Sequence, residues 1–412
     1  MKPLACREGL LYYDLDLKYE LILMKLAKIK KSSQETPSEF RTWIEIDKKF
    51  LENNYKIFRS IIPKNCCLMS VVKSNAYGHG LIDFSKEISK LGVDWLGVDS
   101  VVEALALRRE GIKKPILILG YTRPAMMKRA IENDISITIS SFESFSALQK
   151  VVTTTSMPAK IHIKVDTGMH RQGFLSGDQK TLTLKIKNQK ARIIIEGLYT
   201  HFASAKNPSF PKYTNTQIEQ FQDWIEAFRK SGLNPMTHAA ATSGTLIFPQ
   251  SHFDMVRVGI GLYGLWPSPE VEEYCGEKKF LKPVLTWKTI VSEIKKVKAG
   301  SKIGYDSTET LEEDTTIAIC PIGYWHGFPR ALSSIGRVLV GGKRCRVIGR
   351  VSMDMISVDV SKAGSVKIGD EVVVMGRQGR EEITADYLAG LADTTNYELV
   401  TRINPLIKKF YI

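Results

Sequence analysis

Short apolar and β-branched runs alternate with longer segments of helical periodicity between residues 68 and 258. This alternation constrains the fold more than any other feature, because strands separated by helices pair in parallel within one sheet. Helix-like stretches such as 102–110 and 217–230 lie between the runs. We count eight runs, at 68–73, 95–99, 115–119, 136–140, 160–165, 192–200, 236–239 and 254–258. Eight strands alternating with helices predict an α/β fold, specifically a (β/α)8 TIM-like barrel.

The pattern changes after the barrel, where shorter runs are joined by tight glycine turns. Strands are predicted at 284–297, 315–319, 336–340, 344–350, 355–360 and 371–375, with a short helix near 384–392. Such runs indicate a predominantly antiparallel β domain. We therefore predict an N-terminal extension of unknown role over 1–39, a barrel domain over 40–275 and a β domain over 276–412. A further strand at 42–46 lies outside the barrel count and is expected to pair elsewhere.

Charge and cysteine usage narrow the possible partners. The formal net charge of +14 over 412 residues could serve a polyanion, but the basic residues are dispersed and no nucleic-acid-binding motif accompanies them. No run approaches the roughly 20 uninterrupted apolar residues of a membrane span. The six cysteines are scattered, without the paired spacing of a zinc site. We expect a cytoplasmic protein with no nucleic acid, membrane or metal partner.

Reactive side chains follow several of the predicted strands, where a (β/α)8 barrel carries its active site. Lys73 ends the first run, Asp166, Arg171 and His201 follow later ones, and Arg257 lies in the eighth. Small residues at 241–244 and 259–260 expose backbone N–H groups where barrels often bind phosphate. A lone lysine at a strand end usually only reaches solvent. Beside a phosphate site and arginines, it suggests a Schiff base with the aldehyde of pyridoxal phosphate.

Several separate motifs, in the same order, make the chain resemble the alanine racemases from about residue 40 to residue 412. They are Val-Val-Lys-Ser-Asn-Ala-Tyr-Gly-His-Gly at 71–80, Lys-Val-Asp-Thr-Gly-Met-His-Arg at 164–171, Gly-Leu-Tyr-Thr-His-Phe at 197–202, Asp-Met-Val-Arg-Val-Gly-Ile at 254–260, Ile-Gly-Tyr at 303–305 and Val-Ser-Met-Asp at 351–354. The resemblance implies a pyridoxal-phosphate enzyme that interconverts L- and D-alanine for cell-wall peptidoglycan. It also implies a homodimer with shared active sites.

The resemblance assigns the two bases that racemisation requires. Lys73 would bind the cofactor and act on one face of the substrate, and Tyr305, supplied by the partner subunit, would act on the other. Two groups are needed because the proton leaves Cα on one side and returns on the opposite side. Arg171 would contact the cofactor and the tyrosine, and His201 would hydrogen-bond to that tyrosine. Lys164 corresponds to a lysine that is often carbamylated in the family, although a plain salt-bridged or surface lysine remains the alternative.

The resemblance also assigns the cofactor contacts. Arg257 would face the pyridine nitrogen and keep it unprotonated, with His238 behind it. Met353 and Asp354 would belong to the partner's pocket, near the substrate carboxylate and the entrance. The phosphate would be bound by Tyr77, Thr242, Ser243, Gly259 and Ile260.

Three departures from the family pattern leave substrate breadth and cofactor affinity open. Ala241 precedes Thr242 where an Asn-Ser pair is usual, and Pro405 replaces a tyrosine that reaches the phosphate in some members. The stretch 323–327 reads Gly-Tyr-Trp-His-Gly in place of Gly-Tyr-Ala-Asp-Gly. The alternatives are a racemase of serine, lysine or a broad set of amino acids, or a noncatalytic protein that binds the same cofactor.

Overall fold

The computed structural model describes residues 35–276 and 281–412. Residues 42–412 form one compact unit, separate from the segment that ends at Arg41. Most of the predicted N-terminal extension therefore lies outside the described residues. Its described end contains a 3-10 turn, Pro37–Glu39, which begins after Thr36.

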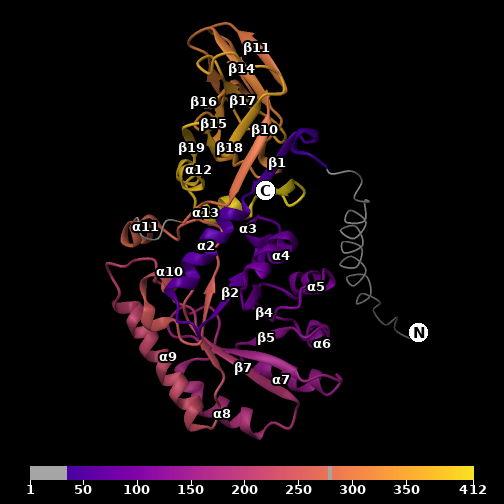
Figure 1. Ribbon diagram of the computed structural model, residues 1–412, viewed down its shortest axis with the longest axis vertical. Helices are drawn as coiled ribbons and strands as arrows, with labels where there is room; N and C mark the ends of the chain where they lie inside the picture. Colours follow the sequence, from indigo (N-terminus) through magenta and orange to yellow (C-terminus); the bar gives the residue numbers. More distant parts are fainter. Residues whose placement is uncertain (1–34, 277–280) are drawn as a thin grey trace, which may run out of the picture. The chain divides into compact units, whose positions relative to one another are not determined.

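The first part of this compact unit is a closed parallel barrel, as predicted (Figure 1). Its strands follow the chain order without exception. They are β2 (Cys67–Val71), β3 (Trp95–Val98), β4 (Ile116–Ile118), β5 (Ser136–Ile139), β6 (Ala159–Lys164), β7 (Ile193–Tyr199), β8 (Met236–His238) and β9 (Met255–Val258). The barrel closes where β9 pairs with β2, with Met69 opposite Arg257. All eight predicted strands are confirmed.

Helices connect these strands and bury their apolar faces on the barrel. Several begin at side chains that accept a backbone N–H, for example Ser100 before α5 and Asp47 before α2. The longest, α9, buries Phe221, Trp224 and Phe228 on one face. The helices that follow successive strands are α4 (Leu81–Leu91), α5 (Val101–Arg109), α6 (Pro124–Glu132), α7 (Phe142–Val152), α8 (Gln179–Asn188), α9 (Lys212–Lys230) and α10 (Thr242–Ile247), while α2 (Lys48–Ile61) precedes the barrel and α11 (Pro269–Cys275) follows it.

The interior of the barrel differs between its two ends. Met69, Trp95, Leu117 and Met255 form an apolar cluster near the amino-terminal ends of their strands. Polar side chains such as Thr138, His162 and His238 occupy positions nearer the carboxyl ends.

The C-terminal part is a mainly antiparallel sheet in the order β11-β14-β17-β16-β15-β18-β10-β1-β20, with β19 attached to β18. Strand β1 (Thr42–Ile46) pairs antiparallel with β10 and parallel with β20. The strand predicted outside the barrel count is thus part of this sheet. The other members are β10 (Leu285–Ile290), β11 (Glu293–Val297), β14 (Thr315–Cys320), β15 (Arg337–Val340), β16 (Lys343–Ile348), β17 (Ile356–Asp359), β18 (Glu371–Gln378), β19 (Glu381–Ile383) and β20 (Lys408–Tyr411).

The prediction of one continuous strand over 284–297 is wrong. The chain leaves the ladder at Val291 and Ser292, whose N–H groups donate to the carbonyls of Asp370 and Ile319. Strand β10 then pairs with β1 and β18, whereas β11 pairs with β14 at the far edge. Apolar and β-branched residues continue through the break, so the sequence pattern alone did not reveal it.

Smaller elements complete this part of the chain. A two-stranded ribbon, β12 (Lys302–Ile303) and β13 (Glu309–Thr310), flanks a short 3-10 turn at Tyr305–Ser307. Two short helices, α12 (Ala385–Leu391) and α13 (Asn396–Thr401), precede the last strand. The first of these was predicted and the second was not. Across the described residues, no helix combines the length and apolar character needed to cross a membrane.

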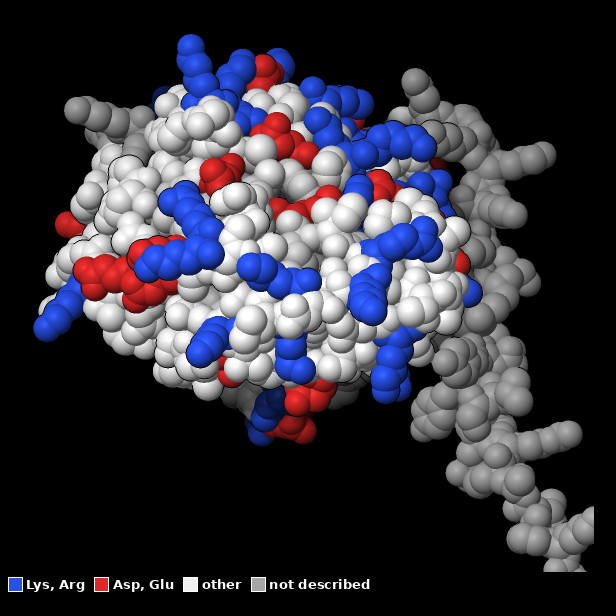
Figure 2. Space-filling model, turned by 90° about the horizontal axis from the view of Figure 1, so that it is seen from below, with Lys and Arg blue, Asp and Glu red and all other residues white. Residues whose placement is uncertain are grey.

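Charged side chains are spread over the face seen in Figure 2, where Lys and Arg alternate with neutral and acidic residues. Many basic groups are also paired, as Lys160 is with Asp134 at 2.7 Å. The excess of positive charge therefore does not form a continuous basic patch on this face, which is what a polyanion would need.

Candidate active site

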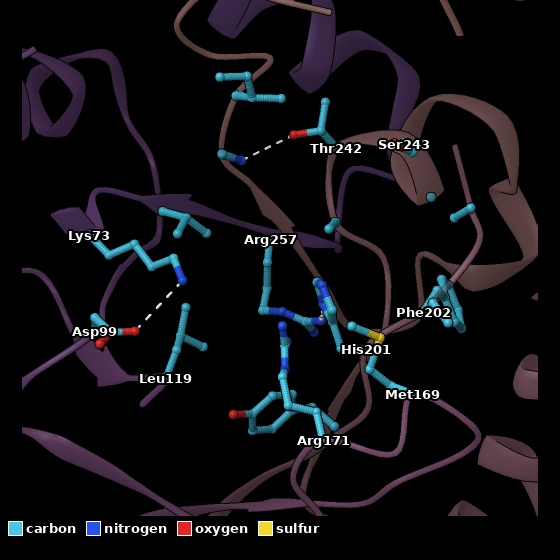
Figure 3. Close-up of a pocket in the computed structure, with 18 of the residues that line it drawn as sticks. Lys73, Asp99, Leu119, Met169, Arg171, His201, Phe202, Thr242, Ser243 and Arg257 are labelled. Carbon is cyan, nitrogen blue, oxygen red and sulfur yellow. Dashed lines mark hydrogen bonds and ion pairs between the residues drawn. The ribbon is translucent and has the colours of Figure 1, made fainter. Parts of the chain in front are cut away.

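A cavity of about 760 Å³ opens at the carboxyl ends of the barrel strands (Figure 3). Among the described residues that line it, five are Lys or Arg and one is Asp. Such an excess of positive charge favours an anionic ligand. The cavity brings together ten of the predicted site residues, namely Lys73, Tyr77, Lys164, Arg171, His201, Thr242, Ser243, Arg257, Gly259 and Ile260.

Lys73 enters the cavity directly after β2. Its Nζ lies 3.6 Å from Oδ1 of Asp99, the acidic residue that lines the cavity (Figure 3). The next four residues, 74–77, all have φ values between 51° and 56°. This left-handed conformation costs roughly 1–2 kcal/mol per residue for L-amino acids. Strain of this kind persists only where neighbouring structure enforces it, and it gathers at functional sites.

Specific contacts enforce the left-handed turn. The Asn75 side chain accepts the N–H of Leu81 at 3.0 Å, and the carboxylate of Glu103 accepts the N–H of both Asn75 and Asp99. Gly78 ends the turn against the backbone carbonyl of Val400 in α13, where a side chain could not fit. The lysine and its acidic neighbour are therefore held by one network.

Arg257 extends into the barrel from β9 and is only 3% exposed. Its guanidinium donates to the carbonyls of Thr200 at 2.7 Å and Ala239 at 2.8 Å. It also lies 2.8 Å from Nδ1 of His238 and 3.3 Å from Nδ1 of His201. Burial lowers its pKa to about 10, so the group remains charged at neutral pH.

A chain of neutral histidines continues behind Arg257. Because a guanidinium can only donate, Nδ1 of His238 accepts, and its Nε2–H donates to Nδ1 of His162 at 2.9 Å. Burial, reinforced by Arg257, holds the pKa of His238 well below its usual value and lowers that of His162 to about 3. Tyr199 stacks on His238 at 4.7 Å. His238 thus lies behind the arginine as expected, whereas His162 and Tyr199 were not predicted.

Arg171 is positioned by a loop wrapped around a carboxylate. Asp166 accepts the N–H groups of Gly168, His170 and Arg171 at 2.9–3.1 Å. Burial alone would raise the pKa of Asp166, but these three donors hold it below its ordinary value. The loop returns to β6 through the contact between Val165 and Phe174. The Arg171 side chain is thereby placed at the cavity wall (Figure 3).

Lys164 is buried rather than at the surface, with 6% of its area exposed. Its Nζ donates to Oε1 of Gln172 at 3.2 Å. Burial, together with the positive charges of Arg171, Arg257 and Lys73, lowers its pKa to about 8. A substantial fraction of this amine is therefore neutral near pH 8 and available as a nucleophile.

The part of the cavity wall formed by Tyr77, Thr242 and Gly259 presents small residues and hydroxyl groups. The Thr242 hydroxyl accepts the N–H of Gly259 at 3.2 Å and that of Gly261 at 3.4 Å. A Cβ at Gly259 would lie 2.8 Å from the phenolic oxygen of Tyr77, so glycine is required for this approach. Burial raises the pKa of Tyr77 to about 12, which keeps its phenol protonated and able to donate. These donors suit a phosphate.

Besides His238, which lies behind Arg257, three predicted residues do not line the cavity of a single chain. Tyr305 is 68% exposed and Met353 is 54% exposed, and Asp354 is also exposed. Within the chain, Nδ1 of His201 lies 3.3 Å from the Arg257 guanidinium, and burial lowers the pKa of His201 to about 3. One chain therefore does not bring the lysine and the tyrosine together.

Several lining residues were not predicted from the sequence. They include Asp99, Phe202, Lys206 and Tyr397. Asp99 follows β3 directly, so its place at a strand end was an available signal. Lys206 and Tyr397 lie in a loop and a short helix, where no periodicity points to the cavity. Within the described ranges, no group of three or more His, Cys, Asp or Glu side chains is arranged to hold a metal ion.

Comparison with known proteins identifies both parts of the chain. Residues 46–267 match the family model described as the alanine racemase N-terminal domain, and residues 284–411 match the alanine racemase C-terminal domain. An alanine racemase of Symbiobacterium thermophilum is 40% identical over 371 residues, covering 90% of this chain and 97% of the relative. One from Methanococcus maripaludis is 39% identical, covering 90% of this chain and 98% of the relative.

Solved structures agree in fold. The alanine racemase from D-cycloserine-producing Streptomyces lavendulae superposes with a TM-score of 0.86 at 34% identity, covering 92% of this chain and 98% of the other. The alanine racemase of Bacillus anthracis, solved with bound L-Ala-P, gives a TM-score of 0.85 at 35% identity, covering 90% and 95%. The motifs, the barrel with its β domain, and these likenesses over nearly the whole chain place this protein in the alanine racemase family.

Proposed function

We propose that this chain interconverts L- and D-alanine with pyridoxal phosphate bound covalently to Lys73. The observation that carries this proposal is the pairing, in one cationic cavity, of a lysine amine at the end of β2 with a buried and charged Arg257. D-Alanine made in the cytoplasm would then supply peptidoglycan synthesis.

The cavity residues fit the cofactor in chemical terms. Lys73 would bind its aldehyde, Arg257 would face its ring nitrogen, and the cavity offers cations and N–H donors for its charges. When bound, the cofactor withdraws electrons from the substrate and so acidifies the Cα–H bond. The phosphate would be held by Tyr77, Thr242, Ser243, Gly259 and Ile260.

Arg257 directs the outcome of the reaction. A guanidinium fixed by two carbonyls and His238 cannot give up a proton to the ring nitrogen. With the cofactor bound, negative charge would be withdrawn less completely from Cα, which would favour return of the proton at that atom. Racemisation is therefore favoured over amino-group transfer.

The second base must come from another copy of the chain. Tyr305 is exposed and lies outside the cavity, and further large apolar residues are exposed in the same β domain. They are Tyr324, Trp325, Met353 and Met355. A homodimer would cover these residues and bring Tyr305 opposite Lys73, with the partner's Met353 and Asp354 near the substrate. Arg171 and His201 would then orient the phenol.

The first experiment replaces the lysine. Lys73→Ala should lose the long-wavelength absorbance of the lysine-bound cofactor and reduce D-alanine formation to background, because no other residue supplies that bond. Lys295→Ala, on the exposed strand β11, is the matched control and should keep both signals. Full activity in Lys73→Ala would refute the proposal.

Tyr305→Phe tests the assignment of faces. The variant should slow proton removal from one enantiomer by on the order of a hundredfold or more, because one general base is lost. Exchange of the Cα proton of the other enantiomer with deuterated solvent should be affected much less. Equal slowing of exchange from L- and D-alanine would contradict the two-base arrangement.

Arg257→Glu tests the restraint on the ring nitrogen. A carboxylic acid there can donate a proton, so the ratio of pyruvate to D-alanine formed from L-alanine should rise above that of the native protein. Arg257→Gln removes the charge without adding an acid and should not raise this ratio. If both variants give the same ratio of pyruvate to D-alanine as the native protein, the proposed role of Arg257 is wrong.

Lys164 should react with carbon dioxide, because its pKa of about 8 leaves a neutral amine where free lysine has almost none. The resulting carboxylate would lie among the positive groups that lower the pKa of Lys164. It would pair with Arg171, the foremost of these groups, and orient its guanidinium. Incorporation of isotope-labelled bicarbonate, followed by carbon NMR, should rise as pH increases through 8 and disappear in Lys164→Met. Lys160→Met, whose lysine pairs with Asp134, is the control. An unchanged carbamate signal in Lys164→Met would exclude Lys164 as the carbamylated residue.

A further inference from the structure

Lys206 is a cation of the cavity wall that no step above uses. It lies in the loop after β7, next to the buried Ala205, and both residues line the cavity. The hydroxyl of Ser268 donates to the backbone carbonyl of Lys206 at 3.1 Å. The backbone at this point is therefore anchored.

The ammonium of Lys206 lies above an aromatic ring near the proposed phosphate site. Its Nζ is 4.4 Å from the ring centroid of Tyr397 in α13. The Tyr397 ring is in turn 6.2 Å from the ring of Tyr77, whose phenolic oxygen adjoins Gly259. A continuous series of contacts thus connects Lys206 with the hydroxyl and N–H donors of that wall.

Of the five cavity cations, Lys73 alone has a carboxylate partner among the described residues, and neither Arg171 nor Lys206 has a hydrogen-bonded side-chain partner there. Lys73 faces Asp99, Lys164 donates to Gln172, and Arg257 donates to two carbonyls and to His238. Over residues 35–276 and 281–412, no carboxylate forms an ion pair with Lys206. Lys206 is an exposed residue, although burial of part of its side chain lowers the pKa of the amine. A cation that loses hydration without gaining a carboxylate is stabilised by an anionic ligand.

We propose that Lys206 is a further cofactor-binding residue, whose ammonium contacts the cofactor phosphate from the side of Tyr397. This inference rests on the proposed function. It gives the phosphate a contact in place of the one that Pro405, which has no donor, cannot make. Tyr397 acts as a positioning residue, because its ring holds the ammonium beside Tyr77.

The test separates the phosphate from the rest of the cofactor. Full-length protein freed of cofactor is titrated with pyridoxal phosphate and, separately, with pyridoxal, which lacks the phosphate. The dissociation constant is read from the long-wavelength absorbance of the lysine-bound form. Lys206→Met should weaken binding of pyridoxal phosphate roughly ten- to hundredfold, the range for loss of one hydrogen bond to a charged group. Its affinity for pyridoxal should equal that of the native protein.

Two further variants provide controls. Lys206→Arg keeps the charge and should retain most of the affinity for pyridoxal phosphate. Lys282→Met removes a lysine that lies over the ring of Phe50 at 5.2 Å but does not line the cavity, and it should bind both compounds normally. Increasing salt should weaken binding of pyridoxal phosphate to the native protein more than to Lys206→Met, because one ionic contact is already absent.

The outcomes distinguish this inference from the proposed function. Native affinity of Lys206→Met for pyridoxal phosphate would overturn the inference, and a raised KM for alanine alone would assign the lysine to the substrate carboxylate instead. Equal loss of affinity for both compounds would show a structural role and also overturn it. Failure of the native protein to develop the absorbance band with either compound would refute the proposed function, and the inference with it.

Discussion

The buried charge of Arg257 is the constraint on which the interior of the barrel depends. A guanidinium that is 3% exposed is tolerated only if its donors are satisfied, and here two carbonyls and His238 accept them. His238 must then stay neutral and present Nδ1, which requires its Nε2–H to find an acceptor in His162. The backbone approaches His162 so closely at Gly197 that no side chain could be accommodated there. The charge on β9 thereby dictates residue types on β6, β7 and β8.

Lys73 is positioned by a strained backbone turn and not by a buried charge. Its position depends on a left-handed turn whose conformational cost is offset by the contacts of Asn75, Glu103 and Gly78. Gly78 meets the carbonyl of Val400 in α13, so the β domain's last helices help to keep the turn in place. The amine and the guanidinium are fixed independently, one by strain and packing and the other by hydrogen bonds.

The sequence predicted the barrel well because its strands are short, apolar and separated by clear helical spacing. It placed Lys73, Arg171 and Arg257 in one cavity, since strand ends of a parallel barrel converge. His162 escaped notice because a lone histidine within an apolar strand usually indicates only a buried, hydrogen-bonded ring. The break at Val291 was missed since apolar character continues through it, and it depends on pairing partners far away in the sequence. Tyr305 came from family resemblance alone, and no contact within the chain could have placed it.

The balance of charge in the cavity links ligand binding to stability. Five cations face one carboxylate, so their mutual repulsion opposes the folded state when no anion is bound. Burial lowers the pKa values of Lys164 and Arg257, and at Lys164 the neighbouring positive charges of Arg171, Arg257 and Lys73 add to this cost of the protonated form. A ligand that carries a phosphate relieves this repulsion and binds only the folded chain, which stabilises it by mass action. Sites that hold a cofactor in this way trade stability of the empty protein for affinity. The excess of cations is therefore better explained by binding of an anionic ligand than by stabilisation of the fold.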